Sequence, residues 1–364
     1  MLFLESKMPK RKYLSLITAL GLLLTGCMTP SAASQASQPD TQNLPPIIAM
    51  GDMHGDYDAY ERLMRAAGLL DVNGDWSGGK TIFVQTGDIP DRGPDTRKII
   101  ESLQHIEQQA ARAGGTVIPM VGNHEAMNIY RDLRYVHPGE YRAFVMDSSG
   151  DLRRNYYSAN RVKIEAGFRE EEPGLTSDQI QSRWEKDTPL GKLEHRAAWS
   201  PSGYIGKWIA GNRVVAKVRG YLFAHGGYSQ EFSRFSLDDM NKAAGSALQT
   251  QDRSRETILR HRLGPLWYRG NVRGRKDDPG FNPDQEIDQV LQTYQATHII
   301  VGHTRSEKGI RVSRRGRLLQ VDTGASAHYG GVPSFLRIEN GEFFAHTLKG
   351  FKKLKIANDH VNQE

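Results

Sequence analysis

Short apolar runs recur along the chain from residue 47 onward, and each is followed by a loop that contains Gly, Asp or His. The runs span residues 47–50, 81–85, 116–121, 221–224, 297–301 and 318–321. Their length and their β-branched and aromatic content predict β-strands. Between the first three runs, apolar residues at helical spacing predict two amphipathic helices, one with Tyr60, Leu63 and Met64 and one with Ile99 and Leu103 on a single face. This alternation predicts an α/β fold with mixed sheets.

The stretch 130–207 breaks the alternation, because it is rich in Arg, Glu, Tyr and Trp. We expect it to form a largely helical insertion that covers one end of the fold. The folded domain is expected to span residues 47–350, and residues 351–364 are expected to form a C-terminal tail.

The N-terminal residues have the pattern of a targeting segment. Basic residues at positions 7–12 precede an apolar run from Tyr13 to Gly26, which is too short to span a bilayer but matches a signal-peptide core. The run ends at Leu24-Thr25-Gly26-Cys27, which resembles a bacterial lipobox with Cys27 as the lipidation site. We therefore expect a lipoprotein signal peptide at 1–26, a flexible tether at 27–46 and a periplasm-facing location in the bacterial cell envelope. An ordinary signal peptide or an N-terminal membrane anchor is the alternative.

Composition and charge exclude several classes of protein. The chain has 364 residues, of which 25% are charged and 38% hydrophobic, so it is not a multi-span membrane protein. Its formal charge of +6 falls to +3 without residues 1–26, which carry four basic groups and one acidic group, so we expect no nucleic-acid binding. The single cysteine, Cys27, excludes an intrachain disulfide and a multi-thiolate metal site. Because Ala33 lies six positions later, the C-x5-R loop of cysteine-dependent tyrosine phosphatases is also excluded.

Polar clusters follow five of the predicted strands. They read Gly51-Asp52-Met53-His54-Gly55, Gly87-Asp88-Ile89-Pro90-Asp91-Arg92-Gly93, Gly122-Asn123-His124-Glu125, Ala224-His225-Gly226-Gly227 and Gly302-His303-Thr304. Loops at the carboxyl ends of strands collect side chains in one place, so we expect these clusters to converge. Asp52 and His54 alternate along the chain and can ligate one ion, whereas Asp88 and Asp91 require a compensating cation or partner if they are buried. Oxygen and nitrogen donors without sulfur indicate Mn, Fe or Zn.

The ordered set GDMHG, GDIPDRG, GNHE, AHGG and GHT resembles the calcineurin-like metallophosphoesterase superfamily, in its phosphoprotein phosphatase branch. The longer strings GDIPDRGPDTRKII, GNHEAMN, DLRYV, AHGGYS and LWYRG are similar to the bacterial Shewanella-like protein phosphatases. The resemblance extends from residue 47 to about residue 329. It implies a metallophosphoesterase-type four-layer α/β/β/α sandwich with two mixed β-sheets and the helical insertion.

The resemblance also implies a site for two divalent metal ions. By motif, Asp52 and His54 hold the first ion, Asp88 bridges both, and Asn123, His225 and His303 hold the second. Ions in such a site lie roughly 3.5–4 Å apart and lower the pKa of a shared water, so that a bridging hydroxide attacks phosphorus directly. The resemblance further implies that Arg92 neutralises phosphate oxygens and that His124, oriented by Asp91, protonates the leaving oxygen as the general acid.

Three further residues have less defined roles in this resemblance. Arg269 is the best candidate for the second phosphate-binding arginine of eukaryotic relatives, with Arg273 and Arg275 behind it. The segment around Tyr329 resembles the loop that places a tyrosine over the site. Asp322 is expected to support a ligand histidine or to be a residue of a plain turn.

These features predict a metal-dependent phosphomonoesterase that acts on phosphoserine, phosphothreonine or phosphotyrosine in proteins. Hydrolysis of small phosphate esters or of symmetrical dinucleoside polyphosphates is an alternative, because that group carries the same five motifs. A non-catalytic metal-binding envelope module is a second alternative, and the complete ligand set disfavours it. The expected partners are a phosphoprotein or small phosphorylated substrate and, through the N-terminal lipid, a membrane.

Overall fold

The computed structural model describes residues 44–356 of the chain. The expected signal peptide, Cys27, most of the expected tether and residues 357–364 lie outside the described residues. Within residues 44–356, no helix combines the length and the apolar character needed to span a membrane.

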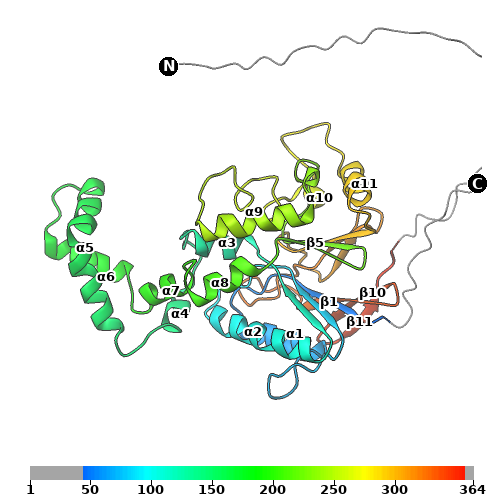
Figure 1. Cartoon of the computed structure of the whole chain (residues 1–364), viewed down its shortest axis with the longest axis horizontal. Coiled ribbons are helices and arrows are strands. Elements are labelled where there is room, and N and C mark those ends of the chain that lie inside the picture. The colour runs from blue at the N-terminus through cyan, green and yellow to red at the C-terminus, as the bar shows by residue number, and fades with distance from the viewer. Residues whose placement is uncertain (1–43, 357–364) are drawn as a thin grey trace, which may run out of the picture. The chain divides into compact units, whose positions relative to one another are not determined.

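Two β-sheets form the centre of the structure (Figure 1). The first contains β1 (Ile47–Met50), β2 (Ile82–Gln85), β3 (Thr116–Pro119), β9 (Ser334–Glu339), β10 (Glu342–Thr347) and β11 (Gly350–Lys353), in the order β11-β10-β9-β1-β2-β3. The second contains β4 (Val215–Val218), β5 (Tyr221–Ala224), β6 (His298–Val301), β7 (Arg311–Ser313) and β8 (Leu318–Gln320), in the order β4-β5-β6-β8-β7. Both sheets are mixed: β1, β2 and β3 pair in parallel, as do β5, β6 and β8, whereas the remaining pairs are antiparallel.

Successive strand residues face opposite sides, so each sheet has an inner and an outer apolar face. Ile47 and Ala49 of β1 belong to the core between the sheets, together with Phe223 and Ile300 of the second sheet. Ile48 belongs to the outer core, which includes the buried faces of α1 (Tyr57–Ala66) and α2 (Thr96–Arg112). Helices α9 (Leu237–Gln249) and α11 (Pro283–Thr293) contribute buried residues beside the second sheet. The predicted four-layer α/β/β/α sandwich with two mixed sheets is therefore confirmed.

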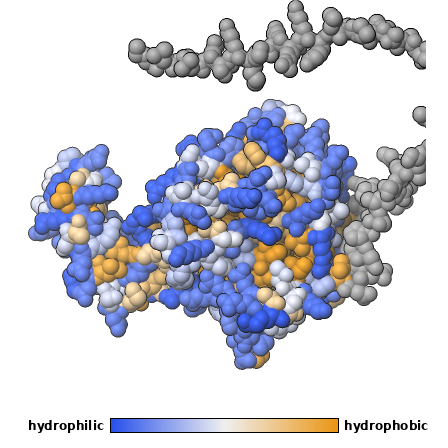
Figure 2. All heavy atoms as spheres, in the orientation of Figure 1, coloured by the Kyte–Doolittle hydropathy of each residue, from blue (hydrophilic) through white to orange (hydrophobic). Residues whose placement is uncertain are grey.

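The stretch 130–207 is largely helical, as expected. It contains α4 (Pro138–Arg142), α5 (Ser149–Glu171), α6 (Ser177–Asp187), α7 (Lys192–Ala198) and the first half of α8 (Tyr204–Gly211). Instead of covering an end of the fold, α5 and α6 extend away from the sheets (Figure 1). The reason is that α5 has no continuous apolar face: only Ser149, Tyr157 and Glu165 are buried. Figure 2 shows a largely hydrophilic surface, with apolar patches both on this arm and on the body.

The structure also contains strands that the sequence pattern did not predict, namely β4, β7, β9, β10 and β11. Strand β11 lies within the stretch expected to form the C-terminal tail, and it pairs with β10. All four residues of β11 are exposed at the sheet edge, where no apolar alternation is required. Three short elements complete the fold: α3 (Asn123–Ile129), a 3₁₀ turn (Phe232–Arg234) and α10 (Gly270–Arg273).

Candidate active site

The five polar clusters converge at the carboxyl ends of β1, β2, β3, β5 and β6. They meet in a cleft of about 330 Å³. Its lining comprises Asp52, His54, Asp88, Arg92, Asn123, His124, Tyr135, Trp267, Arg269, Arg273, His303, Arg305, Asp322 and Tyr329. His225 and Asp91 lie directly behind this lining and are completely buried. The structure thus brings together all the expected site residues of the folded domain.

Tight backbone turns direct these side chains into the cleft. His54, Asp88, Asp91, Arg92 and His303 all have positive φ, between 46° and 73°. Each such residue costs on the order of 1–3 kcal/mol, so the surrounding contacts must hold it in place. These residues lie in the loops that follow β1, β2 and β6, so the chain turns beyond the carboxyl ends of these strands.

The carboxylate of Asp88 lies at the centre of the cluster. Its Oδ1 accepts a hydrogen bond from the backbone N–H of His124 at 2.9 Å, and its Oδ2 lies 3.1 Å from Nε2 of His225. Its backbone oxygen accepts hydrogen bonds from the N–H groups of Met53 and His54. Burial raises the pKa of Asp88, but the imidazoles of His225 and His124 outweigh burial and hold it well below its usual range. Asp88 therefore remains an anion that can bind cations.

Glu125 holds the backbone at Asp88 in place, a role that the sequence reasoning missed. Its Oε2 accepts hydrogen bonds from the N–H groups of Gly122 (2.8 Å) and Asp88 (3.0 Å), and its Oε1 accepts one from Ile89 (2.7 Å). Burial, with the nearby Asp88 charge, raises the pKa of Glu125 to about 7. The available signal was its position three residues after Gly122 at a helix start, the capping-box arrangement.

Asp52 joins the first and fifth clusters. Both of its oxygens lie within 3.2 Å of the backbone N–H of His303, which donates to them. Burial and the neighbouring carboxylates of Asp322 and Asp88 raise the pKa of Asp52 well above its usual value. Asp322 lies beside Asp52, and its expected role as a support for a ligand histidine stays a prediction.

Backbone carbonyl groups orient two of the histidines. Nδ1 of His54 donates to the carbonyl oxygen of Pro90 at 3.1 Å, and Nδ1 of His225 donates to that of Thr86 at 2.9 Å. Because each Nδ1 carries its proton toward a carbonyl, each Nε2 is left as a lone-pair donor inside the cluster. Burial lowers the pKa of His54 to about 3, which keeps its ring neutral.

The donor atoms form two groups that share Asp88. His54, Asp88 and His124 form one, and Asp88, His225 and His303 form the other; within each, the possible ligand atoms lie within 4.8 Å of one another. Nε2 of His303 is buried and has no hydrogen-bond partner among the described residues, as expected of a ring nitrogen that faces a metal ion.

Two other expected ligands lie beside these groups. Asn123 Oδ1 is 3.0 Å from His225 Nε2, beside the second group. Asp52 Oδ2 is 3.9 Å from His54 Nε2, beside the first. These residues can bind two metal ions, and the individual ligand assignments stay predictions.

His124 and Asp91 form a buried pair at the edge of the metal-binding cluster. Nδ1 of His124 lies 2.5 Å from Oδ2 of Asp91, whose Oδ1 accepts a hydrogen bond from Asn128. Nε2 of His124 lies on the side of Asp88, 3.9 Å from its Oδ2. Burial lowers the pKa of His124, but the carboxylates of Asp88 and Asp91 outweigh burial and raise it. The ring is therefore oriented and kept basic.

Arg92 is held between two aromatic rings. Its guanidinium carbon lies 4.7 Å from the ring centre of Tyr135 and 5.2 Å from that of Tyr329. The backbone N–H of Arg92 donates to the carbonyl oxygen of Tyr135. Tyr329 lies over the cluster, 5.3 Å from the His54 ring, and is also covered by Arg305 at 4.2 Å. Sequence reasoning assigned no role to Tyr135 or Arg305, because neither belongs to a strand-end cluster.

Arg269 reaches the cleft, as expected. Its guanidinium donates to the carbonyl oxygen of His303 at 2.5 Å and to Oγ1 of Thr304 at 3.1 Å. Arg273 also lines the cleft. Arg275 does not, because it pairs with Asp277 on the surface. The cleft thus contains four arginines around its anionic centre, namely Arg92, Arg269, Arg273 and Arg305.

A family model described as calcineurin-like phosphoesterase matches residues 45–306. The chain belongs to this family. Shewanella-like protein phosphatase 2 of Arabidopsis thaliana is 28% identical, over 85% of this chain and 79% of the relative. Shewanella-like protein phosphatase 1 of Plasmodium berghei is 26% identical, over 86% and 77%. The structure of a cold-active protein-tyrosine phosphatase from a psychrophilic Shewanella species is 27% identical, with a TM-score of 0.62 and coverage of 87% and 82%.

Family membership confirms the predicted resemblance and identifies the chain as a phosphatase, a hydrolase of phosphorylated substrates whose family uses a dinuclear metal centre. In this phosphoesterase the cleft described above holds every motif that the family resemblance implied.

Substitution Glu125→Gln tests the supporting role of Glu125. An amide NH₂ would face a backbone N–H donor, so Asp88 would lose its fixed position. We expect a metal affinity lower by about 10- to 100-fold and a smaller rise in Tm on addition of Mn²⁺. Isothermal titration calorimetry and thermal unfolding measure both effects. The matched control is Glu101→Gln on the exposed face of α2; equal behaviour of the two variants would contradict the role of Glu125.

Proposed function

We propose that this phosphoesterase removes phosphate from phosphoserine, phosphothreonine or phosphotyrosine residues of proteins. One observation carries the proposal: a guanidinium, a carboxylate-paired histidine and two metal-binding groups line one open cleft. The names of the two curated relatives and of the Shewanella structure supply the class of substrate, since each is called a protein phosphatase.

The donor set fits two divalent ions, and Mn, Fe or Zn are the proposed metals. Asp52 and His54 would hold one ion, Asp88 would bridge, and Asn123, His225 and His303 would hold the other. When bound, such ions lower the pKa of a shared water and neutralise charge on the phosphate oxygens. The carboxylates and imidazoles favour these borderline metals over thiolate-selective ones.

The protein's own groups act on the substrate from the rim of the cluster. Arg92, fixed between Tyr135 and Tyr329, presents a planar guanidinium that can bind two phosphate oxygens. Arg269 is proposed to bind a further phosphate oxygen. Nε2 of His124 is proposed to donate its proton to the leaving oxygen, while Asp91 holds Nδ1 and thereby fixes the ring.

A substrate panel tests the proposed function. Purified protein reconstituted with Mn²⁺, Fe²⁺ or Zn²⁺ is assayed on phosphoserine, phosphothreonine and phosphotyrosine peptides, nucleotides and diadenosine tetraphosphate. We expect kcat/KM to be highest for phosphopeptides, because the cleft is open to the surface and is lined by four arginines. Better turnover of a nucleotide or dinucleoside polyphosphate would overturn the choice of substrate.

The same assay tests the alternative of a metal-binding module without turnover. On para-nitrophenyl phosphate, Asp88→Asn should lose both metal and rate. His124→Ala should retain metal and lose mainly kcat, by about 10²–10⁴-fold on substrates with poor leaving groups. Wild-type activity that neither substitution reduces would contradict the proposed site.

Substitution Asp91→Asn tests the general acid through the pH dependence. His124 must be protonated to donate, so activity falls as pH rises through its pKa. The Asp91 carboxylate helps to raise that pKa, and removing the charge leaves burial to lower it. The alkaline limb of kcat/KM should therefore move to lower pH, while Asp58→Asn on α1 should leave the profile unchanged. An unshifted limb for Asp91→Asn would argue against His124 as the acid.

We also propose that Cys27 carries the lipid that anchors the protein to the bacterial envelope, facing the periplasm. The support is the Leu-Thr-Gly-Cys sequence after a signal-like apolar run. A single acyl chain binds membranes weakly, so the proposed anchor requires several chains. Substitution Cys27→Ser should move the protein from the membrane fraction to the soluble periplasmic fraction, measured by immunoblot. An unchanged distribution would contradict lipidation.

A further inference from the structure

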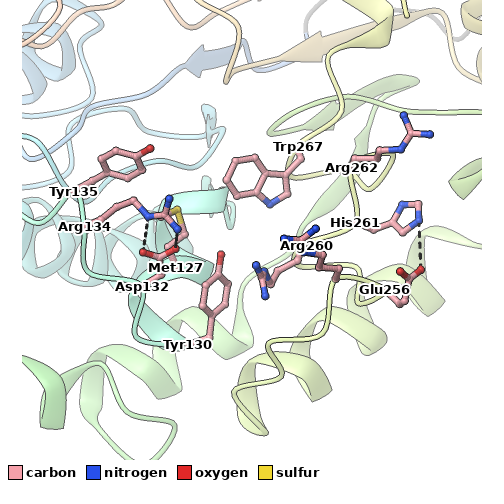
Figure 3. Close-up of a pocket in the computed structure, with 11 residues that line it drawn as sticks. Met127, Tyr130, Asp132, Arg134, Tyr135, Glu256, Arg260, His261, Arg262 and Trp267 are labelled. Carbon is pink, nitrogen blue, oxygen red and sulfur yellow. Dashed lines mark hydrogen bonds and ion pairs between the residues drawn. The ribbon is translucent and has the colours of Figure 1, made fainter. Parts of the chain in front are cut away.

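A second pocket adjoins the catalytic cleft and is larger, at about 630 Å³ (Figure 3). We call it the flanking pocket. It is lined by Met127, Tyr130, Asp132, Arg134, Tyr135, Arg255, Glu256, Arg260, His261, Arg262 and Trp267. One wall follows α3, and the other is the segment between α9 and α10 (Figure 3). None of the residues that line the flanking pocket is an expected metal ligand or catalytic residue.

The flanking pocket borders the catalytic cleft. Tyr135 and Trp267 line both cavities. Tyr135 stacks on Arg92, and the edge of Trp267 lies against the His303 ring at 5.8 Å between centres. A substrate whose phosphate lies beside Arg92 can therefore extend between Tyr135 and Trp267 into the flanking pocket. A peptide covers about 3.3–3.6 Å per extended residue, so a few residues reach it.

The floor of the flanking pocket is apolar and its rim is basic. Met127 and Tyr130 are almost fully buried, at 2% and 4% exposure. Among the charged side chains of the lining, four are arginines and two are carboxylates. The Asp132 carboxylate is already bound by Arg134 through two hydrogen bonds of 2.7 and 2.5 Å. Glu256 lies at the exposed rim, 4.0 Å from His261.

Two of the arginines have no carboxylate partner within residues 44–356. Arg262 pairs with Asp277, whereas neither Arg255 nor Arg260 has a carboxylate oxygen within 4.0 Å in the part of the chain that the structure describes. The Arg260 guanidinium lies over the Tyr130 ring, 5.4 Å from its centre, and its Nη1 donates a hydrogen bond to the backbone oxygen of Arg253. A planar guanidinium held in this way is well suited to bind a carboxylate or a phosphate.

We propose that the flanking pocket binds an anionic side chain, an acidic or phosphorylated residue, a few positions from the residue being dephosphorylated. This inference rests on the proposed protein phosphatase function and deepens it, because it predicts sequence preference at that site. The apolar floor contacts the aliphatic part of the peptide, and Arg255 and Arg260 contact its anion.

The test uses phosphopeptides that differ only in one residue, Glu, Gln or Lys, moved along successive positions on either side of the phosphoresidue. At one or two positions we expect Glu to give a kcat/KM about 3- to 10-fold above Gln, with Lys below Gln, as for an exposed or half-exposed ion pair. The difference should lie in KM, since the pocket is remote from the bond being broken, and it should shrink as salt increases.

Charge reversal at the two arginines makes the test specific. In Arg255→Glu and in Arg260→Glu, the preference should change from Glu toward Lys at the same peptide position. Arg260 packs on the buried Tyr130 ring, so its substitution could impair folding. Arg255 is exposed, and its variant remains informative in that case. The control is Arg183→Glu, an exposed arginine on α6 that pairs with Glu172 outside both cavities; it should keep the wild-type preference.

Two results would overturn the inference in different ways. If phosphopeptides are hydrolysed but flanking charge has no effect on KM in the wild type and in both variants, the flanking pocket is not a peptide site, although the protein phosphatase function stands. If para-nitrophenyl phosphate and diadenosine tetraphosphate are hydrolysed but phosphopeptides are not, the proposed function itself is wrong. In that case, a KM for diadenosine tetraphosphate that is lower in the wild type than in Arg260→Glu would indicate that the flanking pocket binds the second nucleoside.

Discussion

The buried carboxylate of Asp88 makes contacts with most of the loops that form the cleft. Its Oδ1 holds the start of α3 through the N–H of His124, its Oδ2 lies against His225 after β5, and its backbone oxygen holds the loop after β1 through His54. Asp52 extends the network to His303 after β6. The two sheets therefore meet at this edge through an anion, and displacement of Asp88 would loosen several strand-end loops together.

Such a network is costly without cations. Asp52, Asp88 and Asp322 are all nearly fully buried within one cluster, and burial together with mutual repulsion raises the pKa of Asp52 and Asp322. Positive φ at Asp88 and His303 adds strain to the loops that carry these groups. Two divalent ions would reduce the repulsion between these carboxylates and would give the unpaired ring nitrogen of His303 a partner. We therefore expect the stability of this cluster to depend on the ions that it binds.

Sequence patterns predicted the parts of this structure that are buried and periodic. The six apolar runs became strands, and the Gly-, Asp- and His-rich loops converged as predicted, because parallel strands end at one edge. Strands β4 and β11 were missed: the first is one half of a short hairpin, and the second is an exposed edge. Glu125 and Tyr135 were missed because one acts on backbone N–H groups and the other reaches Arg92 only through the path of the loop after α3. Residue spacing signals the helix cap at Glu125 but not its contact with Asp88, and it carries no signal for the contact of Tyr135 with Arg92.

The division between the two cavities follows from where their residues originate. Strand-end loops, pinned by Asp88 and Asp52, supply the metal donors, so small changes there would disturb several ligands at once. The flanking pocket is built mostly from loop segments, and it contacts this network at its border, through Tyr135, Trp267 and Met127 of α3. Its arginines can therefore change without moving a metal ligand. On physical grounds, substrate preference can be altered in this pocket while the chemistry of the cleft is preserved.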